Sequence, residues 1–92
     1  MVNIRSKGGP MKIAETLADR HKTHGNYKHQ AATAQKLKAV MREFPNWESL
    51  PMDMKESLEL IATKLSRIGH GDPYHMDSWH DIEGYARLIC KD

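Results

Sequence analysis

The feature that most constrains the fold is one amphipathic stretch in the second half of the chain. Apolar residues recur there three or four positions apart, which is the spacing of one helix face. The stripe consists of Leu58, Ile61, Ala62, Leu65 and Ile68. Because an amphipathic helix gains most of its stability by packing its apolar face against other elements, this stretch predicts the core helix of the domain.

Three further helices are predicted around this core helix. The first covers residues 11–21 and stops at Gly25 and Asn26, and the second covers about 28–44 and is rich in small residues. A fourth covers about 77–90. Its predicted inward-facing residues are Trp79, Ile82, Tyr85, Ala86 and Ile89. The chain shows neither internal repeats nor the strict alternation of a β-strand.

The connection 45–51 begins and ends with proline, so neither neighbouring helix can continue through it. Trp47 and Leu50 are expected to pack down from this connection as a lid on the bundle. Asp53 and Glu56 follow in the spacing of a capping arrangement for the core helix.

Together these elements predict an all-α fold, a compact four-helix bundle-like domain over residues 11–92 behind a flexible lead-in of residues 1–10. A chain of 92 residues buries only about 60–65 % of its unfolded surface. We therefore expect a homo-oligomer.

Composition excludes several classes of protein. With 14 basic and 12 acidic residues the net charge is +2, and without long basic runs the chain is not expected to bind duplex nucleic acid. The one cysteine, Cys90, has no partner for a disulfide or a cysteine-based zinc site. No apolar stretch reaches the roughly 18 residues of a membrane span, and no signal-peptide pattern opens the chain, so a cytoplasmic location is expected.

Asp77 and Asp81 stand four residues apart at the start of the fourth predicted helix, so their carboxylates share one face. Hard cations such as Mg²⁺ prefer such oxygen ligands and can keep sites for water and substrate phosphates. The alternative is that Asp77 caps the helix and Asp81 is a solvated acid of its first turn.

Lys64 and Arg67 share a face of the core helix, three residues apart. If the third and fourth helices are antiparallel, both cations come near Asp77 and Asp81. This arrangement has two interpretations, a salt-bridged helix pair or a pocket prepared for a metal-bound nucleotide.

The turn His24-Gly25-Asn26-Tyr27 could stack on a base and donate backbone N–H groups, or it could be a plain connection between helices. The six histidines lack the spacing of a zinc motif. Gly84 lies inside the fourth helix, where glycine costs about 1 kcal/mol relative to alanine, so close helix packing or a close ligand is expected there. Neither a nucleophile motif nor a phosphate-binding glycine loop is present.

The segments KLSRI (64–68), DSWHDIEGYA (77–86) and DRHKTHGNY (19–27) resemble the signature of a small phage and prophage domain family of unassigned function. That family is similar to the all-α nucleoside-triphosphate pyrophosphohydrolases of the MazG-like group. The likeness covers roughly residues 15 to 90. It implies a dimer or tetramer in which carboxylates hold Mg²⁺ and an activated water cleaves between the α and β phosphates.

On this resemblance, Asp77 and Asp81 correspond to the acidic pair of the later helix. Glu59 would complete the metal site, and Glu59 and Asp81 would be the catalytic carboxylates. The chain departs from the family pattern on the earlier helix. Glu56 and Glu59 fit the acidic motif there only loosely, and Lys64 and Arg67 face the expected metal.

Three hypotheses follow. The first is a Mg²⁺-dependent nucleotide pyrophosphohydrolase whose substrate-binding residues are Lys64, Arg67, Tyr27 and Tyr85. The second is a module that sequesters a nucleotide without cleaving it, using the basic pair and the turn from Gly25 to Tyr27. The third is a structural or interaction protein without a ligand.

Overall fold

A computed structural model of the chain describes residues 17–19 and 21–90, and all regular structure in these residues is helical. Short helical segments at 17–19 and 21–24 come first. The elements that follow are α2 (Tyr27–Met41), the 3₁₀ helix η1 (Trp47–Ser49), α3 (Met52–His70) and α4 (Met76–Ile89). The predicted all-α class is confirmed; the lead-in 1–10 and the predicted helix start at Met11 lie outside the described residues.

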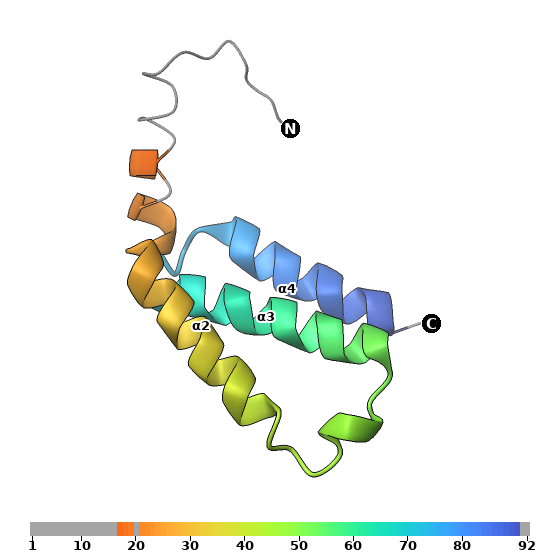
Figure 1. Cartoon of the computed structure of the whole chain (residues 1–92). Coiled ribbons are helices and arrows are strands. Elements are labelled where there is room, and N and C mark those ends of the chain that lie inside the picture. The colour runs from red at the N-terminus through yellow and green to blue at the C-terminus, as the bar shows by residue number, and fades with distance from the viewer. Residues whose placement is uncertain (1–16, 20, 91–92) are drawn as a thin grey trace.

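Helix α3 is the central element, with α2 packed along one side and α4 along the other (Figure 1). Helices α3 and α4 run antiparallel. Lys64 of α3 lies opposite Asp81 of α4, whereas Ser57, two turns earlier, lies opposite Tyr85. The antiparallel arrangement, on which the nearness of the cations to the acids depended, is therefore present.

Small side chains occupy the places where the helices meet. Ala62 and Ser66 of α3, Ala34 of α2 and Ser78 of α4 are all buried. The Ser66 hydroxyl donates a hydrogen bond to the backbone carbonyl of Gln30, which ties α3 to α2. Short side chains let helix axes approach closely, as the small residues of the second predicted helix indicated.

Two predicted helix boundaries need correction. Helix α3 begins behind Pro51, which makes no side-chain cap, and the Asp53 carboxylate in the first turn instead accepts a hydrogen bond from the N–H of Met54 at 2.9 Å. Helix α4 begins behind His75, so Asp77 is a first-turn acid rather than the cap. Pro51 itself is extended, with φ −58° and ψ 154°, and the N–H that proline lacks is not used in helical hydrogen bonds at this position.

The two tryptophans behave differently. Trp47 is buried at 6 % exposure, as predicted for the lid, and Leu50 is partly buried. Trp79 was predicted to face inward, but it remains 46 % exposed. Its indole N–H donates to the backbone carbonyl of Pro73 at 2.7 Å, and this bond holds the ring over the α3–α4 connection.

A backbone crossing joins the turn before α2 to the end of α3. Gly25 has a φ of 81°, and a Cβ there would lie 2.0 Å from the backbone oxygen of His70. A Cβ on Gly71 would lie 2.0 Å from the oxygen of Thr23, and the N–H of Asp72 donates to that same oxygen at 2.8 Å. Both glycines are therefore required by contact between two backbone segments.

Candidate ligand-binding site

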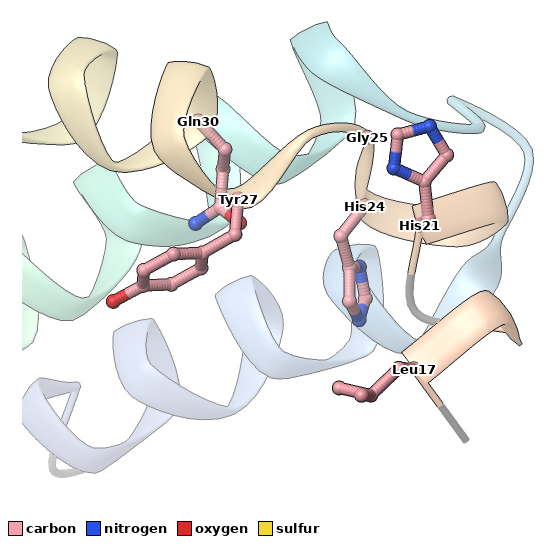
Figure 2. A pocket seen from close by; sticks show the side chains of 6 residues that line it. All are labelled: Leu17, His21, His24, Gly25, Tyr27 and Gln30. Atoms are coloured by element: carbon pink, nitrogen blue, oxygen red, sulfur yellow. The ribbon is translucent and has the colours of Figure 1, made fainter. Parts of the chain in front are cut away.

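A hollow of about 430 Å³ opens beside the turn that precedes α2, and we call it the turn hollow (Figure 2). It is lined by Leu17, His21, His24, Gly25, Tyr27 and Gln30. Its volume lies within the range of about 300–1,000 Å³ that small-molecule sites occupy. The sequence left open whether the turn His24-Gly25-Asn26-Tyr27 is a plain connection or a ligand site. In the structure this turn connects two helical segments, and His24, Gly25 and Tyr27 also line the turn hollow.

A second, more polar recess of about 130 Å³ lies between α2 and α3, and we call it the arginine pocket. It is lined by Tyr27, Gln30, Ala31, Ala34, Gln35, Lys38, Thr63 and Arg67. The Nε atom of Arg67 is shielded from solvent and makes no hydrogen bond to any described residue. Arg67 also forms no ion pair within the described part of the chain, so its charge is available to a ligand.

The two recesses share Tyr27 and Gln30 and are therefore neighbours along the first turns of α2. Tyr27 is 70 % exposed, so one face of its ring can accept a stacked planar group. Lys38, which lies three turns further along α2 than Tyr27, adds a second cation to the arginine pocket. The combined surface offers an aromatic face at one end and two cations at the other.

The predicted basic pair does not act as a pair. The ammonium of Lys64 lies 2.9 Å from a carboxylate oxygen of Asp81, and its side chain is only 13 % exposed. Arg67, in contrast, lines a recess against α2. Lys64 therefore belongs to the salt-bridged α3–α4 pair, and Arg67 belongs to the candidate site.

The three predicted metal ligands have separate partners. A carboxylate oxygen of Glu59 lies 3.3 Å from Arg42, and Asp81 pairs with Lys64. Asp77 lies 3.5 Å from the imidazole of His75. The described residues contain no group of three or more acidic, histidine or cysteine side chains placed to hold a metal ion.

Two residues of the predicted fourth-helix motif lie outside both recesses. Tyr85 is half-buried on α4, where its backbone carbonyl accepts a hydrogen bond from the Ser57 hydroxyl at 3.3 Å. A Cβ on Gly84 would meet no atom of the described residues within 4 Å. The expectation that close packing requires this glycine is therefore wrong for the described part of a single chain.

Histidines stabilise the backbone crossing. The ring of His24 meets the ring of His75 edge-on with centroids 5.8 Å apart. The Nε2 atom of His70 lies 2.7 Å from the hydroxyl of Thr33 on α2.

Sequence reasoning missed Gln30 and Lys38. A signal for Gln30 was present, since a glutamine three residues after Tyr27 lies on the same face as that tyrosine. Gln30 is 3 % exposed, and a buried glutamine is unusual enough to indicate a specific task. Lys38 carried no distinguishing signal among the lysines of this helix.

Comparisons with known proteins give no match: no family model, no curated protein and no solved structure is similar to this chain. None of the helices in the described residues combines the length and the apolar character needed to cross a membrane. The candidate site is therefore assigned from its own geometry.

Proposed function

We propose that the protein binds a nucleotide, with its phosphates at Arg67 and its base against Tyr27. The observation that carries this proposal is the unpaired guanidinium of Arg67 in a pocket that shares Tyr27 with the turn hollow. Guanidinium groups bind phosphate oxygens through parallel, charge-assisted hydrogen bonds. An anion at this point would satisfy the shielded Nε–H.

The sizes of the two recesses suit the two ends of a nucleotide. The arginine pocket, at about 130 Å³, has room for phosphate groups but not for a base as well. The turn hollow, at about 430 Å³, has room for a planar heterocycle beside an exposed aromatic ring. Lys38 takes the place beside Arg67 that the sequence had assigned to Lys64.

The separation of the acids favours binding without cleavage. Within the described residues, Glu59, Asp77 and Asp81 each face a different basic partner. Mg²⁺-dependent hydrolysis, which the family resemblance implies, stays a prediction and would need carboxylates brought together in another way. A structural protein without a ligand would bind no nucleotide at all.

The test is calorimetric titration of the protein with ATP, GTP, CTP and UTP, with and without Mg²⁺, alongside measurement of pyrophosphate release. Arg67→Met and Lys38→Met should each weaken nucleotide binding about 10- to 100-fold, because each removes charge-assisted hydrogen bonds. Lys36→Met is the matched control, because Lys36 is exposed on the same helix and lines neither recess.

The free protein supplies a second readout. A guanidinium with a shielded, unbonded N–H contributes little to stability, so Arg67→Met should unfold at or above the wild-type temperature while losing affinity. Absence of binding to every nucleotide, or equal loss of affinity in Lys36→Met, would refute the proposal. Mg²⁺-dependent release of pyrophosphate would show that the hydrolase hypothesis is correct instead.

A further inference from the structure

Gln30 is held firmly by its backbone. Its N–H donates to the carbonyl of Asn26 at 2.9 Å, and its own carbonyl accepts the hydroxyl of Ser66 from α3. With 3 % of its surface exposed, it is one of the most buried residues of α2. The backbone of Gln30 is therefore held at the α2–α3 contact, and the side chain is buried beside it.

The side-chain amide of Gln30 makes no hydrogen bond to any described residue. Unlike the Nε atom of Arg67, its nitrogen and oxygen are not fully shielded from solvent, so they can meet a group that enters from a recess. Gln30 lines both the turn hollow and the arginine pocket. In Figure 2 the Gln30 and Tyr27 side chains project from the same side of α2, as their spacing of three residues requires.

A primary amide offers one acceptor oxygen and a donor nitrogen side by side. This pair matches the edge of a nucleobase that presents a donor next to an acceptor, and two parallel hydrogen bonds then form in one plane. The Tyr27 ring lies next to this amide and can hold the base by stacking.

We infer that Gln30 is the residue that reads the base of the bound nucleotide, and this inference rests on the proposed nucleotide-binding function. Phosphates anchored at Arg67 fix the approach of the ligand, so every base presents the same edge to Gln30. The four bases differ in the order of hydrogen-bond donors and acceptors along the edge that faces Gln30. Only some bases can therefore make both hydrogen bonds to its amide.

The experiment compares the affinities of ATP, GTP, CTP, UTP and inorganic triphosphate for the wild-type protein, Gln30→Met and Tyr27→Ala. The wild-type affinities for the four nucleotides should spread about tenfold or more. Gln30→Met, which keeps the side-chain volume, should reduce that spread to less than about threefold. Tyr27→Ala should weaken all four nucleotides alike.

The outcomes separate the two proposals. A wild-type protein that binds neither nucleotides nor triphosphate would refute the proposed function itself. A wild-type protein that binds all four nucleotides equally would overturn the role of Gln30 alone, and so would a folded Gln30→Met protein that keeps the full spread. The comparison of the four nucleotide affinities for the wild-type protein needs no variant. It can therefore refute the role of Gln30 even if Gln30→Met does not fold.

Discussion

Gly25→Ala should unfold the protein at a markedly lower temperature, and two separate effects set the size of the loss. A side chain at φ 81° is in the left-handed region, which costs about 1–2 kcal/mol for an L-residue. The new Cβ would also lie 2.0 Å from the backbone oxygen of His70 and 2.6 Å from its carbonyl carbon. Backbone atoms cannot rotate away, so relieving this overlap should cost about another 1–3 kcal/mol, as overpacking does elsewhere.

The sum is about 2–5 kcal/mol, a large fraction of the total stability of a small domain. At about 4–8 °C per kcal/mol for a domain of this size, Gly25→Ala should lower the Tm by about 8 °C or more. Gly71→Ala introduces a similar overlap with the oxygen of Thr23, at a φ of −123° that lies outside the left-handed region. Gly71→Ala should therefore also lower the Tm, through the overlap and without the cost of a left-handed backbone.

Thermal unfolding followed by circular dichroism measures both effects, and Gly69→Ala is the matched control. Gly69 is helical, and its Cβ would meet nothing within 4 Å, so alanine should stabilise α3 by about 0.5–1 kcal/mol. If Gly25→Ala unfolds at the wild-type temperature, the backbone crossing does not form as described. The turn hollow, which Gly25 lines, would then not have the described shape either.

Three further substitutions test the remaining contacts by urea unfolding. Trp47→Ala should cost about 3–5 kcal/mol because it removes the largest of the buried apolar side chains, and a loss below 1 kcal/mol would mean that the lid is not packed. Asn26→Ala should lower the free energy of unfolding by about 0.5–2 kcal/mol, because the Asn26 carboxamide oxygen caps α2 by accepting a hydrogen bond from the N–H of His29 at 3.1 Å. Asn26→Asp keeps the acceptor oxygen and should retain most of that stability. In a double-mutant cycle, Asp81→Asn and Lys64→Met should couple by at most about 1 kcal/mol, because Asp81 is 47 % exposed, whereas a coupling of several kcal/mol would contradict a solvent-screened pair.

The fold was largely predictable because its signals are local. The apolar stripe located α3, and the prolines on either side of Trp47 marked the end of α2 and the start of α3 within a few residues. Gly25 and Asn26 marked the turn before α2, since only a glycine accepts the positive φ and an asparagine can cap the following helix. Each of these signals acts over one or two helical turns.

The candidate site was only partly predictable, because it depends on which neighbour each face of α3 meets. Lys64 and Arg67 are three residues apart on one helix, and spacing alone predicts a shared environment. Helix α3 has a neighbour on each side, however, so Lys64 reaches Asp81 on α4 whereas Arg67 lines a pocket against α2. Helix periodicity tells on which face of its own helix a side chain lies, but it does not tell which other element packs against that face.

Self-association, which the size of the chain led us to expect, stays a prediction, and the burial pattern supports it. The buried apolar side chains of the described residues are those of Ala34, Trp47 and Ala62, a small core for a domain. Leu65, from the predicted core stripe, is 47 % exposed, and Leu88 of α4 is 69 % exposed. Because association stabilises a folded chain by mass action, the Tm should rise with protein concentration, and sedimentation should show a dimer or tetramer. A monomer whose Tm is the same at every concentration would mean that this small core suffices by itself.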